Sequence, residues 1–152
     1  MIIKTKKVDN YIPRLVEKKL EKYINGIGCV LIEGPRSCGK THLGQRYTKS
    51  QFHLQDYSEN QIDNFLYIAN NNPIFDGPKL CLIDEWQLNN NIWDLVKVWI
   101  DQADQNSKYI LTGSTQVSET KKRHDGYGRI ARLRMWPLTI SEFLEDDPLQ
   151  SI

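Results

Sequence analysis

The stretch that decides the fold is VLIEGPRSCGKT, residues 30–41. It opens with a short apolar run that predicts a buried strand, and HLGQRYTKS follows as a predicted helix. Between them, GPRSCGKT matches the pattern G-x-x-x-x-G-K-[ST]. Gly34 and Gly39 permit a tight loop whose backbone N–H groups point inward, and the helix start adds partial positive charge there. The stretch therefore predicts a phosphate-binding loop between a strand and a helix.

The residues of this loop have separate expected roles toward a bound nucleotide. Lys40 can reach the β- and γ-phosphates of a nucleoside triphosphate, and the Thr41 hydroxyl can ligate magnesium. ATP is the expected nucleotide, because the chain has no NKxD-type motif for reading guanine. The nucleotide-binding set predicted from the loop and the helix start is Gly34, Pro35, Arg36, Ser37, Cys38, Gly39, Lys40, Thr41 and His42.

An acidic pair, Asp84 and Glu85, follows the apolar run LCLI. A carboxylate at the end of a strand can hold the shell of a magnesium ion opposite Thr41, which is the role predicted for Asp84. The adjacent Glu85 can polarise an attacking water, as general-base catalysis requires. A helix N-cap with an acidic first turn would have the same sequence. The preceding phosphate-binding loop favours the metal and water roles.

A third polar cluster ends the apolar run YILTGS, where one glycine separates Thr112 from Ser114. A polar side chain there would lie between the magnesium carboxylates and the γ-phosphate, where it could sense hydrolysis. Ser114 is preferred over Thr112 for this role. The alternative is a simple strand-to-loop turn, which the same residues favour.

The dense basic stretch of the chain is KKRHDGYGRIARLRM, residues 121–135. Arg129 follows two glycines and is predicted as an arginine finger or phosphate contact, from the same or a neighbouring subunit. Such a finger neutralises charge that develops in the transition state. Alternatively, the stretch contacts nucleic-acid phosphates, or it is a solvated strand and loop.

Apolar runs alternate with amphipathic segments along the whole chain. Further strands are predicted at QFHLQDYS, LCLID and KYILTGS, and helices at residues 13–24, 61–71 and 91–103. This alternation predicts an α/β chain with a parallel sheet covered by helices on both faces. Combined with the phosphate-binding loop, it predicts the three-layer P-loop NTPase fold. Such sheets bind ligands at the carboxyl ends of their strands, so the polar residues above should converge on one site.

The composition restricts the classes of protein and partner. A length of 152 residues fits one domain, and residues 1–152 are predicted as a single unit. The 20 Lys and Arg against 19 Asp and Glu give no global field that would steer the chain toward nucleic acid or an acidic membrane. No apolar run approaches the roughly 18 residues of a membrane helix. Three widely spaced cysteines complete the expectation of a reduced, cytoplasmic protein without membrane contact.

Five blocks, IPRLVEKKL, VLIEGPRSCGKT, LCLIDEWQ, YILTGS and GYGRIARLRMWPLTISEF, occur in an order that resembles a family of prokaryotic AAA-type ATPases. The resemblance covers Tyr11 to Phe143 and implies an additional-strand fold, in which ILTGS lies between the strands of the P-loop and the acidic pair. It carries nucleotide binding onto the P-loop, magnesium and water activation onto Asp84 and Glu85, and sensing onto Ser114. Two departures are Trp136, where the family tends to have arginine, and the absence of the C-terminal domain of unknown function that usually follows the ATPase domain.

Together these inferences predict a magnesium-dependent ATPase that drives a conformational change in itself or a partner. In the expected reaction, water polarised by Glu85 attacks the γ-phosphate, while Lys40 and magnesium stabilise the developing charge. A homo-oligomer is one expected assembly, since a finger such as Arg129 can come from a neighbouring subunit. The alternatives are a small-molecule kinase with an Arg-rich lid, and a non-hydrolytic, ATP-dependent module that binds DNA or another partner.

Overall fold

The computed structural model describes residues 11–71, 80–102, 108–114 and 128–145 of the chain. Within these ranges, five parallel strands form one sheet in the order β2-β3-β4-β1-β5. The strands are β1 (Cys29–Gly34), β2 (Ser50–His53), β3 (Leu80–Asp84), β4 (Lys108–Ser114) and β5 (Ile130–Arg134). The helices are α1 (Glu17–Gly26), α2 (Lys40–Tyr47), α3 (Glu59–Asn71), α4 (Asn91–Gln102) and α6 (Ile140–Glu145), with short 3₁₀ turns η1 (Leu54–Asp56) and η2 (Trp86–Leu88).

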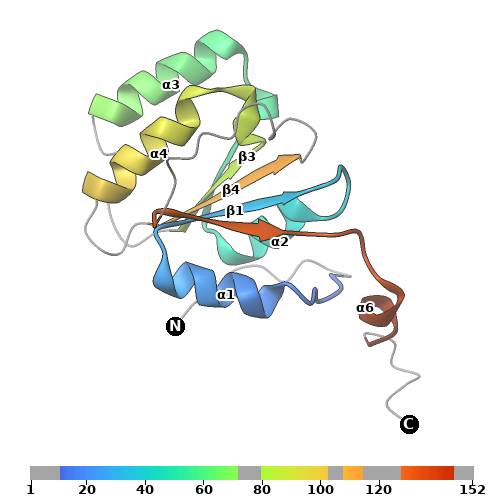
Figure 1. Ribbon diagram of the computed structural model, residues 1–152. Helices are drawn as coiled ribbons and strands as arrows, with labels where there is room; N and C mark the ends of the chain where they lie inside the picture. The colour runs from blue at the N-terminus through green and yellow to red at the C-terminus, as the bar shows by residue number, and fades with distance from the viewer. Residues whose placement is uncertain (1–10, 72–79, 103–107, 115–127, 146–152) are drawn as a thin grey trace.

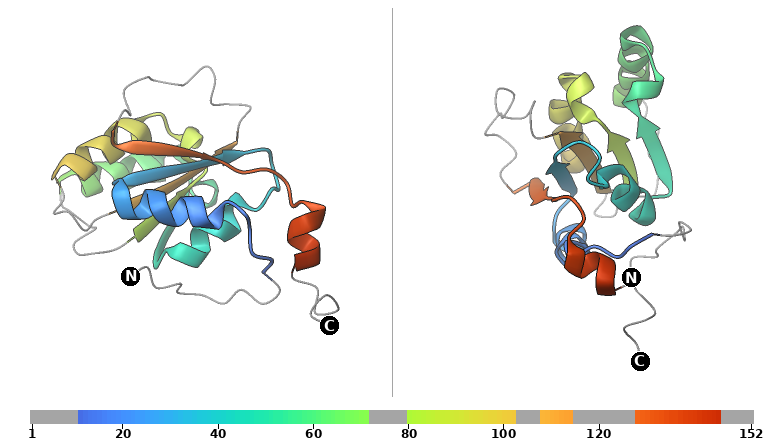
Figure 2. Two further views of the ribbon diagram at one scale, coloured as in Figure 1. Left: turned by 60° about the horizontal axis from the view of Figure 1, so that its bottom comes forward. Right: turned by 90° about the vertical axis from the view of Figure 1, so that its right-hand side faces the viewer.

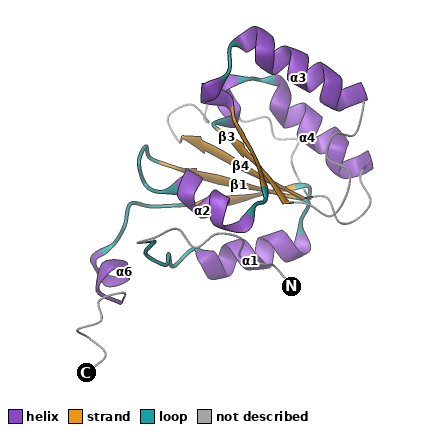
Figure 3. Ribbon diagram, turned by 180° about the vertical axis from the view of Figure 1, so that it is seen from behind, coloured by secondary structure: helices purple, strands orange, loops and turns teal. Residues whose placement is uncertain are grey.

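The elements are arranged in three layers. Helices α3 and α4 cover one face of the sheet, and α1 and α2 cover the other (Figure 1; Figure 3 shows the molecule from behind). Both faces of a parallel sheet must be covered when the central residues of its strands are apolar on both faces, as those of β1, β3 and β4 are here. The three-layer α/β prediction is therefore confirmed.

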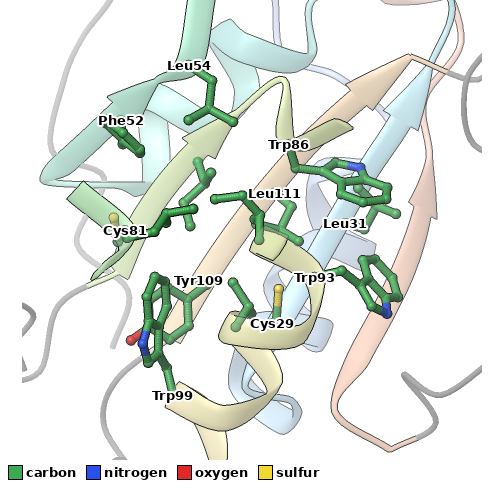
Figure 4. Packing of buried hydrophobic residues seen from close by; sticks show 14 of the residues in the cluster. Cys29, Leu31, Phe52, Leu54, Cys81, Trp86, Trp93, Trp99, Tyr109 and Leu111 are labelled. Carbon is green, nitrogen blue, oxygen red and sulfur yellow. The ribbon is translucent and has the colours of Figure 1, made fainter. Parts of the chain in front are cut away.

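The core under α3 and α4 is rich in aromatic side chains (Figure 4). Trp86 and Trp93 have ring centroids 5.1 Å apart, and Trp99 and Tyr109 have centroids 5.7 Å apart. All four residues are at most 7% exposed. Such rings bury a large apolar area, so this cluster contributes much of the stability of the upper layer in Figure 1.

The core under α1 and α2 is mostly aliphatic. Leu20 and Ile24 of α1 and Leu43 of α2 pack against Val30, Ile32, Leu82, Ile110 and Leu133 of the sheet. Gly44 permits the close approach of α2 to β3, because a Cβ there would meet Leu82 Cδ1 at 2.7 Å. This tight packing sets the start of α2 against the end of the sheet.

The three cysteines, Cys29, Cys38 and Cys81, are free and buried. Burial raises the pKa of the Cys81 thiol to about 11 and raises that of Cys29 as well. Both thiols are thus held in the protonated form, which is the unreactive form of cysteine.

The strand order places β4 between β1 and β3, which confirms the additional-strand arrangement that the resemblance implies. Gly34 at the end of β1 is in register with Ser114 at the end of β4, and His53 of β2 is in register with Asp84 of β3. Since all strands are parallel, their carboxyl ends meet at one edge of the sheet. That edge carries the predicted site.

Two segments at the margins of the fold differ from the sequence prediction. Helix α1 begins at Glu17, four residues after the predicted start, because Arg14 and Leu15 are held by contacts with distant parts of the chain. Helix α6, which was not predicted, lies beside the segment that precedes α1 (Figure 2). None of the helices in the described ranges is both long enough and apolar enough to cross a membrane.

Candidate active site

The P-loop joins the end of β1 to the start of α2, where its backbone has an unusual conformation. Ser37 and Gly39 have φ angles of 59° and 98°, and alternation of this kind turns successive N–H groups toward one concavity. A Cβ at Gly34 would meet the carbonyl oxygen of Met135 at 2.2 Å. Only glycine therefore fits at Gly34, as the motif requires.

The start of α2 adds further N–H donors to this concavity. The N–H of Leu43 is bonded to the carbonyl of Gly39 at 3.0 Å, and the N–H groups of Lys40, Thr41 and His42 precede this first helical bond. These groups carry the partial positive charge of the helix start, which suits phosphate. The side chain of His42 is exposed, so its expected contribution is its backbone alone.

Lys40 lies inside the loop. Its ammonium Nζ donates to the carbonyl oxygens of Gly34 at 3.0 Å and Pro35 at 2.7 Å, and the residue is only 5% exposed. Two neutral carbonyls compensate a buried ammonium less well than a phosphate would, since they carry no full charge. Phosphate oxygens entering the loop would therefore exchange favourably with these carbonyls.

The structure brings together the two magnesium ligands predicted from the sequence. Thr41 Oγ1 donates to Asp84 Oδ1 at 2.7 Å, which joins the first turn of α2 to the end of β3. Hydroxyl and carboxylate oxygens are the hard ligands that magnesium prefers. Their separation is close to the roughly 2.9 Å between neighbouring ligands of an octahedral magnesium ion. The donor set at this point therefore fits magnesium.

Among the described residues, no group of three or more His, Cys, Asp or Glu could hold a metal ion by itself. Magnesium typically binds through one or two protein groups and completes its shell with phosphates and water. The pair of Thr41 and Asp84 is of this kind, so phosphate oxygens and water would have to complete the shell.

Thr112, which the sequence analysis places behind Ser114 for the sensing role, contacts both residues of the acidic pair. Its hydroxyl is fully buried, donates to Asp84 Oδ1 and accepts the N–H of Glu85 at 3.0 Å. Ser114 lies two residues further along the same strand face, in register with Gly34 at the start of the P-loop. Both residues thus lie at the site, and the sensing role of Ser114 stays a prediction. The signal for Thr112 was its place on the strand face that also carries Ser114.

His53 is a second neighbour of Asp84 that the sequence did not indicate. Its Nδ1 lies 3.2 Å from Asp84 Oδ2, and its Nε2 lies 3.1 Å from Gln51 Oε1. The register of β2 against β3 sets this contact, because His53 pairs directly with Asp84. Asp84 is therefore oriented by Thr41, Thr112 and His53 at once.

Glu85 has a left-handed backbone, with φ 59° and ψ 50°. Its carboxylate accepts a hydrogen bond from the side-chain amide of Gln87. The turn packs on β4 at Gly113, where a Cβ would meet Trp86 Nε1 at 2.6 Å and Gln87 Oε1 at 3.1 Å. A non-glycine residue in this conformation is strained, and such strain is frequent at functional sites.

The structure does not bring Arg129 to the P-loop of its own chain. Arg129 precedes β5, and its carbonyl accepts the N–H of Cys29 at the start of β1, about 16 Å of strand away from the loop. Its side chain is paired with Asp101 at the end of α4, with Arg129 Nε and Asp101 Oδ1 2.7 Å apart. A role at the site of a neighbouring subunit stays a prediction.

The other described arginines of the basic stretch lie on the sheet face covered by α4. Arg132 lies 3.7 Å from Glu33 and over the ring of Trp93, and Arg134 lies over Trp136. Lys121, Lys122 and Arg123 lie outside the described residues. These contacts join Arg132 and Arg134 to β1 and to two aromatic rings.

A glycine loop between β1 and α2, an acidic pair after β3, and β4 between these strands define a P-loop NTPase of the additional-strand type. Comparison with known families identifies the group within this class. The chain belongs to the AAA domain family, which matches it over residues 28–144. None of the curated proteins compared with the chain matches it.

Solved structures that share this fold include the following three. The Walker-type ATPase paby2304 of Pyrococcus abyssi aligns with a TM-score of 0.59 and 17% identity over 90% of this chain and 57% of that chain. A RuvB mutant from Thermotoga maritima aligns with a TM-score of 0.59 and 21% identity over 94% of this chain and 52% of that chain. A structure described as the structural basis of katanin self-assembly aligns with a TM-score of 0.56 and 14% identity over 89% of this chain and 55% of that chain. The chain thus spans a little over half the length of these chains, and at such identity the likeness concerns the fold alone.

Proposed function

We propose that the chain binds ATP with magnesium at the P-loop and hydrolyses the γ-phosphate bond. The observation that carries the proposal is the 2.7 Å hydrogen bond between Thr41 and Asp84. It joins two motifs that are 43 residues apart in the sequence and that together supply the protein ligands of a magnesium site, with phosphate and water left to complete the shell. When bound, magnesium would neutralise phosphate charge.

Binding of the triphosphate would rest on the loop and on Lys40. The N–H groups at the start of α2 face the same region as the Lys40 ammonium, which now lies on the Gly34 and Pro35 carbonyls. Exchange of these neutral carbonyls for phosphate oxygens would turn bonds with one charged partner into ion pairs between two opposite full charges. Affinity should therefore depend strongly on Lys40.

Hydrolysis would depend on Glu85, which would take a proton from the attacking water. The contact between Thr112 and the N–H of Glu85 fixes the backbone from which this carboxylate extends, and Gln87 fixes its direction. A positioned general base typically contributes about 10²–10⁴-fold to a rate. The coupling of Asp84 and Glu85 through one buried hydroxyl supports a shared catalytic role.

The test combines nucleotide binding with phosphate release. Wild-type protein should bind a fluorescent ATP analogue and release phosphate from ATP in a malachite-green assay with magnesium. Lys40→Ala should weaken ATP binding about 10–100-fold, because it removes a charged donor. Glu85→Gln should keep the affinity within about 3-fold and lower the turnover about 10²–10⁴-fold.

Two exposed residues provide matched controls, Lys49 for Lys40 and Glu59 for Glu85. Lys49→Ala and Glu59→Gln remove the same charges outside the site and should change neither binding nor turnover. Undiminished phosphate release in Glu85→Gln would exclude Glu85 as the base. A wild-type chain without measurable ATP affinity would refute the proposal as a whole.

Assembly is the remaining part of the proposal. We infer that Arg129 acts on a neighbouring subunit's nucleotide, because its side chain is 44% exposed and faces away from its own site. Specific activity should then rise with protein concentration, and Arg129→Ala should abolish that rise. A specific activity independent of concentration, from a chain that stays monomeric with ATP, would refute the shared site.

A further inference from the structure

Arg14 lies in the segment that precedes α1 and has no role in the site as described so far. Its side chain is 8% exposed, and its guanidinium reaches three separate parts of the chain. Nη1 donates to the carbonyl of Cys38 at 2.7 Å, and Nη2 donates to the carbonyl of Trp136 at 2.6 Å. Nε lies 3.2 Å from Oε1 of Glu142. One planar group therefore joins the P-loop to the chain that leaves β5 and to α6.

The contact with Cys38 determines how the next N–H of the P-loop is directed. The carbonyl of Cys38 and the N–H of Gly39 belong to one planar, trans peptide unit, so they point in opposite directions. Arg14 packs against this peptide unit, with Nη1 3.1 Å from the position that a Cβ of Gly39 would occupy. Because the carbonyl of Cys38 faces Arg14, the N–H of Gly39 is turned to the side away from Arg14.

Glu142 in turn fixes the orientation of Arg14. Its carboxylate accepts the N–H of Leu15 at 2.8 Å, and the N–H and hydroxyl of Thr139 at 2.8 and 3.0 Å. Thr139 also accepts the N–H of Glu142 at 3.3 Å, which is a reciprocal capping box at the start of α6. With four donors around it, the carboxylate has little freedom. The guanidinium is therefore held at a defined angle to the P-loop (Figure 2 shows α6 beside this segment).

We propose that Arg14 is a positioning residue for the phosphate-binding loop, which holds the Cys38–Gly39 peptide so that the Gly39 N–H faces the phosphates. The proposal rests on the proposed nucleotide binding and deepens it, because it assigns phosphate recognition to a residue outside the motif. Without Arg14, the peptide can rotate, and its carbonyl can then face the phosphates and repel them. The loss should concern the phosphate chain of the ligand and not its base.

The test compares two ligands, ATP and inorganic tripolyphosphate, by isothermal titration calorimetry with magnesium. Arg14→Gln should weaken both ligands by about 10-fold, as expected for one misdirected N–H donor to a charged group. Arg14→Lys keeps a cationic donor for the Cys38 carbonyl and should lose less than about 3-fold. A loss for ATP without a loss for tripolyphosphate would overturn the proposal, since it would locate the defect at the base or ribose.

Arg46 provides the matched control for a merely structural role. It is a partly buried arginine beside Glu17, with the two side chains 14% and 10% exposed, and its guanidinium lies over the ring of Tyr11. Arg46→Gln should leave both affinities within about 2-fold, and an equal loss in this variant would overturn the role of Arg14. If Arg14→Gln does not fold, Glu142→Gln replaces it, with an expected loss of about 3-fold.

The outcomes separate this role from the proposed function. A wild-type chain that binds neither ATP nor tripolyphosphate would refute the proposed function, and the role of Arg14 with it. Wild-type binding that is weakened by Lys40→Ala, and that a folded Arg14→Gln or Glu142→Gln leaves unchanged, would refute the role of Arg14 alone.

Discussion

Replacement of Thr112 by valine would keep the shape of the side chain and remove the hydroxyl on which the acidic pair depends. This hydroxyl is fully buried between Asp84, to which it donates, and the N–H of Glu85, which it accepts at 3.0 Å. In Thr112→Val, Asp84 and the N–H of Glu85 remain, but both lose their hydrogen bond to residue 112. Its effect therefore measures how strongly the fold depends on the arrangement of the site, independently of any ligand.

The expected loss can be worked out from the two hydrogen bonds. A bond to a charged carboxylate contributes about 1.5–3 kcal/mol, and a neutral bond contributes about 0.5–1.5 kcal/mol. Asp84 keeps Thr41 and His53, so the total loss should be about 2–4 kcal/mol. This is a large part of the roughly 5–15 kcal/mol of a typical domain. With a urea m-value of about 2 kcal/mol/M, the midpoint should fall by about 1–2 M.

Urea unfolding followed by circular dichroism measures this shift, with Thr48→Val as the control. Thr48 is also a buried threonine, but its hydroxyl lies outside the site and donates to the backbone carbonyl of Gly44 at 3.0 Å. We expect the control substitution to lower the free energy of unfolding by about 1 kcal/mol. A midpoint shift for Thr112→Val no larger than that of the control would refute the reasoning, because the hydroxyl would then not hold the acidic pair.

Two further predictions concern other parts of the site and its support. Gly113→Ala should lower both stability and turnover, because its Cβ would lie 2.6 Å from Trp86 Nε1 and displace the turn that carries Glu85; equal turnover in a folded variant would contradict this. Glu142 is desolvated by burial, but its hydrogen bonds outweigh this effect and lower its pKa to about 2. The carboxylate therefore stabilises the fold above pH of about 4.5, and this contribution is lost as the pH falls to about 2. The full shift corresponds to about 3 kcal/mol, of which we expect roughly half near the solvent-screened surface. In urea titrations, the stability gap between wild type and Glu142→Gln should narrow over this pH range, and a constant gap would count against it.

The part of the site that could be predicted from the sequence is the part that local chemistry specifies. A glycine loop after a buried run, with a lysine and a threonine at the helix start, permits few other structures. The hydrogen bond between Thr41 and Asp84 follows once parallel strands place their carboxyl ends at one edge. Position in the sequence thus sufficed for these residues.

The contacts that the sequence did not indicate depend on register and on long-range packing. His53 meets Asp84 only because β2 and β3 pair with that alignment, and one residue of slip would turn it to the other face. Arg14 contacts Cys38, which is 24 residues away in the sequence, and Glu142, which is 128 residues away. Arg129 was proposed from its neighbouring glycines, but β5 runs parallel to β1 and starts at the edge opposite to the P-loop. Local pattern carries no information about such distances.

The distribution of tryptophan has an optical consequence. Trp86, Trp93 and Trp99 are buried together under α4, whereas Trp136 is 58% exposed next to the segment that contacts the P-loop. Buried indoles emit at shorter wavelengths than hydrated ones, so the unlabelled chain should show two populations of fluorophores. A soluble quencher would silence Trp136 first. The remaining emission includes Trp86, the residue that directly follows Glu85, and would report on events at the acidic pair without any attached dye.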